Sequence, residues 1–497
     1  MSIARAGDAG ALIELGAVSF DELQAALLAA KRYPGVTAAI AGHSSVLVLH
    51  DEPIDLGQLA VRVESRLPPD SDPKVSPTTH ELQVRVTERD SPELPRLLSS
   101  AGMNRNEFLA ELSSLRLRAR YLGFRPGFAY LEGLPVRWNL PRLSTPRVKV
   151  PEGSLGIAGT MAGFYSEVSP GGWNLVGRTD AVLWNPWAVR PNLIAPGDVV
   201  SIKPIEELLV AHESQRPVEN ADSGSDLAEV VASGQLTLLV RGGDRGRCVS
   251  GLPEGGPFDR QAAAVANGAV GNRAGAPILE CVAVGPTIRF LTDCVVSWAG
   301  AAIDMKVNGR PVEGSQQVSV SSEDELTTGP LRDGLRGYLA IHPEPGDDGG
   351  PFQARPTVLT SGRRLRGQTG PSQPLRIRTL ARSSRLLIRS LAGPHPLEET
   401  LLRLIESRSW TVSTLLDRVG IRLLPNEGEV PDLPADLPSC GTQFGTVQWH
   451  PDGNLVVLGP DHPITGGYLQ PMTVMRNELW KLALLKPGES VRWAIER

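Results

Sequence analysis

The sequence predicts a mainly β protein with a small α+β region at its N-terminus, and three observations support this. The 497 residues include 52 glycines and 42 prolines, which favour turns and interrupt helices. Strand patterns recur, as in the apolar run Ser45–His50 and in Glu81–Val86, where polar and apolar residues alternate. Helical patterns are few and short. We therefore expect β-rich domains connected by many turns.

Five short helices are expected from apolar spacing and from capping residues. Serine, asparagine and aspartate at a helix start accept hydrogen bonds from the first backbone amides, and a glutamate three residues later completes a capping box. The expected starts are Ser19 with Glu22, Ser91 before Pro92, Asn104 with Glu107, Asp259, and Leu397 of an amphipathic run to Ile405. The first 100 residues are thus predicted to form a small α+β domain.

Composition limits the class of protein. A net charge of −5 and a pI near 6.0 argue against nucleic-acid binding. The four cysteines lie far apart without CxxC spacing, as is typical of a reduced cytoplasmic protein. The N-terminus lacks the apolar core of a signal peptide, and no run of about 18 apolar residues predicts a membrane span. We therefore expect a cytoplasmic location.

An internal similarity predicts that a domain occurs twice. In both halves a Gly-Gly-aromatic sequence precedes a Leu-Trp pair, a Pro-Gly-acid turn and a strand. The first copy comprises Gly171-Gly172-Trp173, Leu183-Trp184 and Pro196-Gly197-Asp198, and the second comprises Gly466-Gly467-Tyr468, Leu479-Trp480 and Pro487-Gly488-Glu489. Chance similarity between common turns is the alternative explanation. We expect domains at 1–100 and 101–210, a polar linker at 211–235, and a second half with two β-rich lobes at 236–497.

The segment 123–135, GFRPGFAYLEGLP, contains three glycines, two prolines and three aromatic residues. Glycine allows the backbone to approach a ligand closely, and proline stiffens a loop. Such loops with aromatic side chains form binding surfaces, but a turn packed by its own aromatic residues fits the composition equally well.

Common catalytic motifs are absent from the sequence. It contains no Walker A motif, no GxGxxG after a strand, no HExxH, no zinc-spaced Cys/His set and no GxSxG elbow. What remains are charged residues in glycine-rich turns. Asp244 and Arg247 lie in one such turn, where a guanidinium can grip a carboxylate or phosphate, or simply close the turn. Asp259 is most simply a helix N-cap.

The segment 123–135 resembles the signature of the first subunit of the allophanate hydrolase / 5-oxoprolinase family, which includes a bacterial kinase-inhibitor protein. The resemblance covers about residues 5–206. Further blocks follow in the family's order: Pro141-Arg142, Pro146-Arg147, Val150-Pro151, 153–159 (GSLGIAG), 169–173 (SPGGW), 177–179 (GRT) and 196–198 (PGD).

The second half resembles the family's second subunit, so the chain looks like a fusion of the two. The matching blocks are 243–247 (GDRGR), 256–259 (GPFD), 266–267 (AN), 270–272 (VGN), 279–280 (LE), 285–286 (GP), 300–301 (GA), 334–340 (GLRGYLA), 465–468 (TGGY) and 487–488 (PG). The resemblance implies cyclophilin-like β-barrels in both halves, the first at 101–210.

The resemblance also implies a chemistry, namely ATP-dependent opening of the lactam ring of 5-oxoproline to give glutamate, with a separate third subunit of the lactam-utilisation type. Such chemistry needs cations for phosphate and carboxylate and an acid that positions water. The residues assigned to catalysis are Asp244, Arg247 and Asp259. Those assigned to binding the amide substrate are Phe124, Arg125, Phe128, Tyr130, Arg178, Asn267, Asn272, Glu280 and Tyr468. We expect ATP as cofactor and no metal.

Some family positions are changed here. Leu112-Ser113 stands where the family has His-Ser, Met161 and Gly243 each replace a glutamine, and 341–346 (IHPEPG) replaces a Gly-Ser-Arg-Ser-Thr block. The chain thus lacks a potential base and a hydroxyl/arginine cluster but keeps the glycine scaffold. Our hypothesis is that the fold is retained while catalysis is altered or lost.

Two alternatives follow from the same family. One is a carboxyltransferase domain of a biotin-dependent urea or allophanate system, which requires a separate biotinylated partner because the chain has no Met-Lys-Met motif. The other is a non-enzymatic regulator that binds a histidine kinase. A homo-oligomer is compatible with each of the three functions. In all of them we expect the ligand in a cleft between the halves, lined by 124–130, Arg178 and 244–247.

Overall fold

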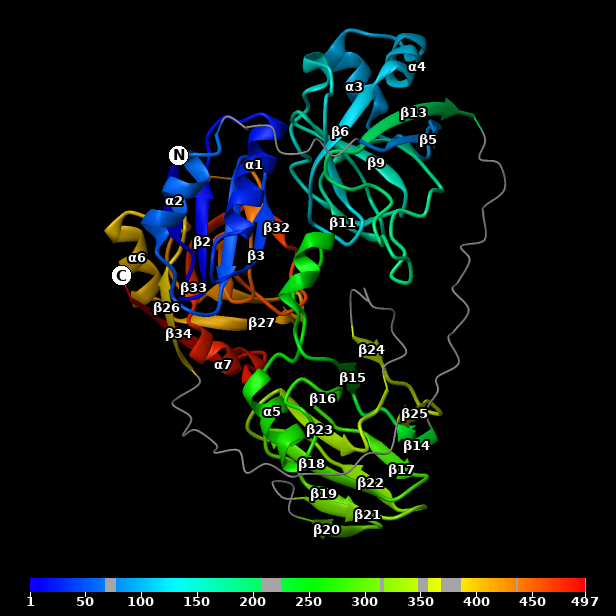
Figure 1. The fold of residues 1–497 in the computed structure, drawn as a ribbon, viewed down its shortest axis with the longest axis vertical. Helices are drawn as coiled ribbons and strands as arrows, with labels where there is room; N and C mark the ends of the chain where they lie inside the picture. The colour runs from blue at the N-terminus through cyan, green and yellow to red at the C-terminus, as the bar shows by residue number, and fades with distance from the viewer. Residues whose placement is uncertain are drawn as a thin grey trace.

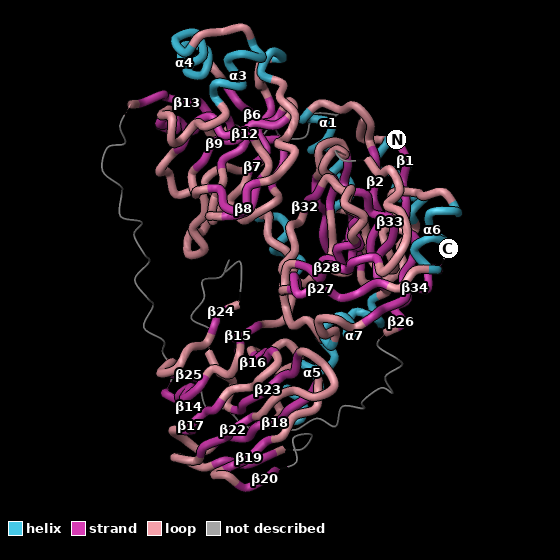
Figure 2. Tube along the Cα trace, turned by 180° about the vertical axis from the view of Figure 1, so that it is seen from behind, coloured by secondary structure: helices cyan, strands magenta, loops and turns pink. Residues whose placement is uncertain are grey.

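The computed structural model describes residues 1–67, 77–206, 225–312, 317–346, 356–367, 386–434 and 437–496. These residues form a small N-terminal sheet, a first closed barrel, a pair of six-stranded sheets and a second closed barrel. The first barrel and the paired sheets lie at opposite ends of the molecule, and the small sheet lies beside the second barrel on one flank (Figures 1 and 2).

The small sheet is antiparallel and is covered on both faces. Its strand order is β1 (Ser2–Arg5), β2 (Gly10–Glu14), β4 (Ser45–His50), β3 (Val36–Ala41). The helices α1 (Phe20–Lys31) and α2 (Leu56–Glu64) pack on one face through a core that includes Leu23 and Leu59. The opposite face, which includes Leu12 and Leu47, packs against Cys440 and other residues of the second half. The sheet therefore belongs structurally to both halves.

The first barrel is a closed ring of seven strands. The ring order is β5 (Thr79–Arg85), β12 (Asn174–Arg178), β9 (Ser154–Ala158), β10 (Met161–Phe164), β7 (Ala129–Glu132), β6 (Arg116–Leu122) and β13 (Val199–Ile205). Helices α3 (Leu94–Ala101) and α4 (Arg105–Ser114) contribute to its core. Because β5 pairs in parallel with β13, the barrel begins well before residue 101, the boundary predicted from the sequence.

The middle of the chain forms two facing six-stranded sheets, which we call the sandwich. One sheet has the order β20 (Arg310–Val312), β19 (Met305–Val307), β22 (Glu325–Thr328), β17 (Thr287–Phe290), β14 (Ser225–Ala232), β25 (Arg364–Gly367). The other has β21 (Val318–Val320), β18 (Cys294–Gly300), β23 (Arg336–His342), β16 (Ile278–Val282), β15 (Leu236–Val240), β24 (Thr357–Val358). Side chains of both sheets share one core, and α5 (Arg260–Ala269) covers the outer face of the second sheet.

The predicted linker at 211–235 is partly wrong. Residues 211–224 lie outside the described residues, but 225–232 form β14, which pairs with β17 and β25 inside the sandwich. The composition of this segment is polar, yet Leu227, Ala228 and Val230 are buried. Tertiary pairing thus gives the segment a regular structure.

The second barrel has the same strand order as the first. Its ring is β26 (Leu387–Ala392), β33 (Leu469–Val474), β30 (Thr446–Trp449), β31 (Leu455–Leu458), β28 (Gly420–Pro425), β27 (Trp410–Leu416) and β34 (Ser490–Glu496), with α6 (Glu399–Ser407) and α7 (Leu479–Leu484) attached. Its first and last strands pair in parallel, as β5 and β13 do in the first barrel.

Each barrel also carries a two-stranded ribbon at the corresponding place in the chain. In the first barrel β8 (Arg147–Val150) pairs with β11 (Ser169–Gly171), and in the second β29 (Cys440–Gly441) pairs with β32 (Thr465–Gly466). The two barrels share the ring order of seven strands, the parallel closure and the ribbon. Chance similarity between the two halves is therefore untenable. The predicted fold class, mainly β with a barrel in each half, is confirmed.

Candidate functional site

The glycine-rich loop 242–256 lies at the junction of the two halves. Within it, η2 (Arg245–Ser250) is a short 3-10 helix capped by Asp244, whose carboxylate accepts a hydrogen bond from the Gly246 amide at 2.7 Å. The carbonyl of Ser250 accepts from the Asn192 side chain of the first barrel at 3.1 Å. The Asp244 carboxylate therefore closes the turn, and its predicted catalytic role stays a prediction.

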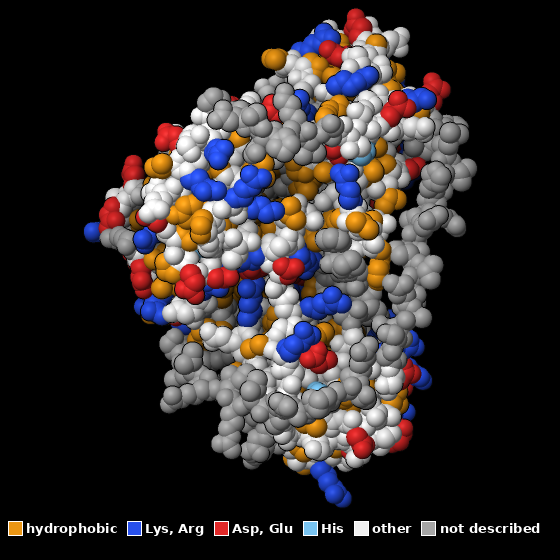
Figure 3. Space-filling view, in the orientation of Figure 1, with side chains coloured by type: hydrophobic (Ala, Val, Ile, Leu, Met, Phe, Trp, Pro, Cys, Tyr) orange, Lys and Arg blue, Asp and Glu red, His pale blue; other side chains and the backbone are white. Residues whose placement is uncertain are grey.

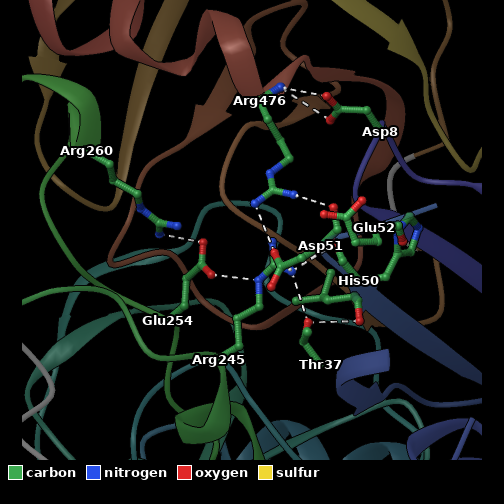
Figure 4. Close-up of polar contacts among 10 residues, drawn as sticks. Asp8, Thr37, His50, Asp51, Glu52, Arg245, Glu254, Arg260 and Arg476 are labelled. Carbon is green, nitrogen blue, oxygen red and sulfur yellow. Dashed lines mark hydrogen bonds and ion pairs between the residues drawn. The ribbon is translucent and has the colours of Figure 1, made fainter. Parts of the chain in front are cut away.

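Arg245 joins this loop to the small sheet. Its guanidinium donates to Thr37 Oγ1 at 3.0 Å and to the His50 carbonyl at 3.1 Å, and it pairs with Asp51 at 3.1 Å (Figure 4). On the other side it pairs with Glu254 at 2.9 Å. One side chain thus connects the small sheet, η2 and the loop that follows it.

Two further arginines extend this chain of charges. Arg260, at the start of α5, pairs with Glu254 at 2.6 Å, and Arg476 pairs with Asp51 at 3.0 Å (Figure 4). Burial alone would raise the pKa of Glu254, but Arg260 and Arg245 outweigh it and hold this pKa below its ordinary value. The partners are 194 and 425 residues apart for Arg245–Asp51 and Arg476–Asp51, so sequence spacing gave no signal for them.

Arg247, which lies on η2 like Arg245, is half-buried. Burial lowers its pKa, and the nearby carboxylates of Asp461 and Asp244 act in the opposite direction. An ideal Cβ added to Gly255 would lie 3.1 Å from Arg247 Nη1, so the glycine leaves the space that this guanidinium occupies. A half-buried cation beside glycine-rich backbone fits a phosphate or carboxylate group.

The loop predicted to bind substrate folds into an aromatic cluster, which we define as Tyr121, Phe124, Phe128, Tyr130, Tyr165 and Trp173. Tyr121 and Tyr130 stack with ring centroids 4.4 Å apart, and Phe128 meets Trp173 edge-on at 5.6 Å. Phe124 is half-buried with φ of 61°. Both interpretations of the loop therefore hold in part, because most rings pack on one another while Phe124 remains partly accessible.

Residues of the second half pack against this cluster. We call the contact surface between the aromatic cluster and the second half the seam. A Cβ at Gly123 would lie 1.8 Å from Thr465 Oγ1, so backbone and side chain meet closely there. Burial raises the pKa of Tyr130, while Arg142, Thr465 and Ser439 oppose the rise. Burial likewise raises the pKa of Tyr121, which also faces Ser439. Both phenols are therefore protonated at neutral pH.

A second polar group lies between the sandwich and the second barrel. Glu280 is fully buried and pairs with Arg418 at 2.9 Å, and Tyr338 donates to the same carboxylate at 3.0 Å. Burial alone would raise the pKa of Glu280, but Arg418 and Arg336 hold it below the ordinary value. Asp259, also buried, caps α5 by accepting from the Ala262 amide at 2.9 Å. Its N-cap role is confirmed, and catalysis by Asp259 stays a prediction.

Asn267 and Asn272 form a separate buried network. Asn272 donates to Asn267 at 3.3 Å and to the Ile341 carbonyl at 2.9 Å, while His342 Nδ1 lies 2.8 Å from the Asn272 carbonyl oxygen. These contacts fix the turn after α5 against β23. The two asparagines therefore support the fold of the sandwich, and their predicted role in substrate binding stays a prediction.

Two further predicted site residues make contacts within their own halves. Arg178, at the far end of β12, donates to the Glu152 carbonyl at 2.8 Å. Tyr468 stacks on His450 with centroids 3.9 Å apart. The expected cleft lining of 124–130, Arg178 and 244–247 stays a prediction; beside two of its segments Gly251 abuts Leu122, with 3.1 Å between an added Cβ and the Leu122 Cβ.

Sequence reasoning missed several residues that complete these sites. Arg142 faces three tyrosines, and Ser439, Arg418 and Asp461 come from the second barrel. Arg142 lies in a block that carried the family resemblance, so that block held the signal. Arg418 and Asp461 can be identified only by comparing the two barrels, whose shared strand order places them in corresponding loops.

Two further structural findings concern metal ions and membrane spans. Across the described ranges, no group of three or more His, Cys, Asp and Glu side chains is arranged to hold a metal ion. Within the same ranges, no helix has the length and apolar character needed to cross a membrane.

On the face shown in Figure 3, Lys and Arg side chains lie interspersed with Asp and Glu.

Comparison with known proteins identifies the family. Residues 1–194 match the model of the carboxyltransferase domain, subdomain C and D, and residues 250–495 match subdomain A and B. The crystal structure of TTHA0988 superposes with a TM-score of 0.83 and 29% identity, covering 98% of this chain and 100% of that one.

Each half has relatives among characterised proteins. The 5-oxoprolinase B-subunit of Escherichia coli O157:H7 is 33% identical over 176 residues, 35% of this chain and 80% of that protein. The 5-oxoprolinase C-subunit of Escherichia coli K12 is 26% identical over 287 residues, 54% of this chain and 90% of that protein.

An Emericella nidulans protein assigned as a urea carboxylase is 30% identical over 295 residues, but the chain spans only 24% of its length. The matches to the two 5-oxoprolinase subunits fall on one polypeptide here, as the predicted fusion requires. The chain belongs to the carboxyltransferase domain family and joins the counterparts of the 5-oxoprolinase B- and C-subunits in a single protein.

Proposed function

We propose that this chain is a component of a cytoplasmic ATP-dependent amidohydrolase of the 5-oxoprolinase type, acting with a separate third subunit. The observation that carries the proposal is that the chain spans 80% of a 5-oxoprolinase B-subunit and 90% of a C-subunit, against 24% of the urea carboxylase relative. The seam between the halves is then the place where the two subunits of the relatives would meet.

The residues at the junction fit a small anionic amide. Arg125 and Arg142 flank the aromatic cluster and supply positive charge for a carboxylate. Tyr121 and Tyr130 keep their protons at neutral pH and lie near Ser439 and Thr465. The packed rings exclude water from one side of the site, which strengthens these polar interactions.

The half-buried guanidinium of Arg247, in the loop 242–256, fits a phosphate group, so we assign it to ATP. Bound ATP supplies the phosphoryl group that activates the amide oxygen. Arg247 would hold a phosphate, and Asp244 fixes the turn that bears Arg247.

The altered family positions have structural counterparts. Leu112 is fully buried in the core of the first barrel, on α4. Ile341 and His342 end β23, where they contact Asn272. These residues pack or support the fold, and they motivate the hypothesis that catalysis is altered or lost relative to 5-oxoprolinases.

The test is glutamate release from 5-oxoproline and ATP by the full chain, with and without the third subunit. We expect release only when both are present, and we expect Arg247→Gln to reduce the rate at least tenfold. Arg137→Gln is the matched control, because Arg137 is exposed on the first barrel and pairs with Glu111 at 2.9 Å. Absence of release from a well-folded complex would refute this activity.

The alternative is a carboxyltransferase of the urea type, which the similarity to the Emericella protein and to the Lachancea kluyveri urea amidolyase favours. Its distinguishing result is carboxyl transfer between a biotinylated partner and urea, without glutamate formation. Binding to a histidine kinase without any turnover would instead support the regulator hypothesis.

A further inference from the structure

The shared strand order of the two barrels pairs two loops that each bear an arginine. Arg125 lies between β6 and β7 of the first barrel, and Arg418 lies between the corresponding strands β27 and β28 of the second. Each arginine pairs with an acid from the loop after the neighbouring strand: Arg125 with Glu167 at 3.4 Å and Arg418 with Asp461 at 2.7 Å. Both acids follow the end of their strand, β10 or β31, at the same distance along the chain.

In the second barrel the arginine also holds a carboxylate from outside the barrel. Arg418 Nη1 donates to Glu280 of the sandwich at 2.9 Å, and Nη2 donates to the Gly256 carbonyl at 2.7 Å. Arg418 thus has one acidic partner within its own barrel, Asp461, and a second one, Glu280, that belongs to the sandwich.

An aromatic ring of the sandwich, that of Phe258, lies next to the Glu280 carboxylate. The Phe258 amide donates to Glu280 at 2.9 Å, and the Phe258 ring enters the core of the second barrel against Phe444 at 5.5 Å. Close by, the Gly255 amide donates to the carbonyl of Pro460 at 3.2 Å. The sandwich therefore fills the rim of the second barrel with a ring next to a carboxylate.

The corresponding rim of the first barrel is more accessible. The Arg125 and Glu167 side chains are 17% and 36% exposed, against 9% and 7% for Arg418 and Asp461. The Arg125 guanidinium lies over the Phe124 ring at 5.7 Å, and Phe124 meets Phe128 and Tyr165 edge-on. Arg125 is thus more accessible to a small molecule than Arg418.

A buried hydroxyl gives an independent indication of a ligand. Ser166 precedes Glu167 as Pro460 precedes Asp461, so it stands where the second barrel accepts the Gly255 amide. Ser166 is 8% exposed, and its Oγ has no hydrogen-bond partner within the part of the chain that the structure describes. Leaving a buried hydroxyl unpaired costs free energy, and a ligand at this rim would remove that cost.

We propose that Arg125, Ser166 and the Phe124 ring bind a small cyclic carboxylic acid, in the position that Glu280 and Phe258 fill on the second barrel. This inference rests on the proposed function and deepens it, since it makes Arg125 the residue that selects the carboxylate of a lactam such as 5-oxoproline. The second barrel does not offer this site to a ligand because Glu280 and Asp461 neutralise Arg418.

The test compares binding of 5-oxoproline with binding of its neutral amide, 5-oxoprolinamide, by calorimetry on the full chain without ATP or third subunit. We expect the acid to bind at least tenfold more tightly than the amide. Arg125→Gln should reduce this preference to less than twofold, and Arg125→Lys should keep part of it. Arg137→Gln, a matched control on the same barrel, should keep all of it.

A variant with the opposite expected effect on binding distinguishes loss of the carboxylate contact from loss of the fold. Glu167→Gln removes the negative charge beside Arg125, so we expect the acid to bind several-fold more tightly and the amide to bind unchanged. Equal binding of acid and amide by the wild-type protein, or an unchanged preference in Arg125→Gln, would overturn the inference.

The outcomes separate this site from the proposed activity. Retained acid preference without glutamate release would refute the activity and support the site. If Arg125→Gln instead weakens assembly with the third subunit and leaves acid binding unchanged, the guanidinium holds an acidic side chain of that partner, and the inference is overturned.

Discussion

At the scale of single residues, Arg418 is the counter-ion of two buried carboxylates. It binds Asp461 through two nitrogen–oxygen contacts of 2.7 and 2.9 Å and Glu280 through one of 2.9 Å. Bringing these charges out of water is costly, and removing one partner leaves the others uncompensated. We expect Arg418→Met to lower the free energy of unfolding of the second barrel by about 3–5 kcal/mol, measured by urea unfolding followed by tryptophan fluorescence.

An exposed pair on the same barrel is the control for this prediction. Arg422 and Asp452 pair at 3.0 Å with side chains 30% and 51% exposed, so Arg422→Met should cost less than about 1 kcal/mol. Equal costs for the two substitutions would show that burial does not determine the contribution of Arg418.

His450 should titrate far below the ordinary range of histidine. Burial lowers its pKa from 6.5 to about 4, and its Nε2 has no hydrogen-bond partner among the described residues. Between these pH values the unfolded chain binds a proton that the folded chain does not, so stability falls as pH falls from 6.5 toward 4. The loss amounts to about 3 kcal/mol at pH 4, because one unit of pKa corresponds to about 1.36 kcal/mol.

The direct measurement is an NMR titration of the histidine rings. We expect one resonance with a midpoint near pH 4, and His450→Gln should remove it. A His450 midpoint at pH 6 or above would contradict the burial argument, because a solvated imidazole titrates there.

At the scale of elements, the seam depends on the absence of a side chain at Gly123. A Cβ there would lie 1.8 Å from Thr465 Oγ1 and 2.8 Å from Thr465 Cβ. Gly123→Ala should therefore push the 123–128 loop away from β32 and destabilise the protein by about 1–3 kcal/mol. The measurement is thermal unfolding by calorimetry.

Two variants separate this clash from a general effect of removing glycine. Thr465→Ala in the Gly123→Ala background should recover part of the loss, because it removes Oγ1 and Cγ2. Gly172→Ala should be nearly neutral, since the atoms nearest to its added Cβ lie at 3.6 Å. A Gly123→Ala protein as stable as the wild type would show that the two segments separate without cost.

Local sequence signals predicted local structure well. Ser19 with Glu22 and Asn104 with Glu107 form the expected capping boxes, and Asp259 caps α5, because these contacts involve residues three positions apart. The helix predicted from Ser91 begins at Leu94, with Glu93 as N-cap, and the helix predicted from Leu397 begins at Glu399. Helix ends shift by this much because several neighbouring residues compete to be the first turn.

Contacts between distant segments were not predictable in the same way. The sequence predicted β5 as an alternating strand but not that it pairs with β13, because period-two alternation does not identify a partner 120 residues away. Likewise, the aromatic loop was predicted to be a binding site from its own composition, whereas its neighbours Ser439 and Thr465 are identified only in the assembled structure. The predicted role of Arg178 stays a prediction, since its glycine-rich sequence does not indicate that it ends β12 and donates to the Glu152 carbonyl.

At the scale of the whole molecule, the halves should remain associated without a covalent link. The small sheet buries Leu12, Leu47 and Leu49 against Cys440 and Ile464. We expect separately expressed fragments 1–210 and 221–497 to co-purify as a 1:1 complex, measured by size-exclusion chromatography with light scattering.

The contact face can be tested with a matched pair of substitutions. Leu47→Asp, at a side chain only 1% exposed, should abolish co-purification, whereas Val61→Asp, at a side chain 66% exposed on α2, should have no effect. Circular dichroism of the first fragment establishes that it remains folded. Co-purification that survives Leu47→Asp would place the main contact elsewhere, for example at the seam.

The two-sided burial of the small sheet also bears on how the chain folds during synthesis. Its strands and helices leave the ribosome long before the residues that complete the cover of its second face, because Cys440 and Ile464 are made nearly 400 residues later. At about 5–20 residues per second, Leu12, Leu47 and Leu49 face water for roughly 20–80 s. A nascent chain that exposes this apolar surface is a natural client of ribosome-associated chaperones until the last barrel closes over it.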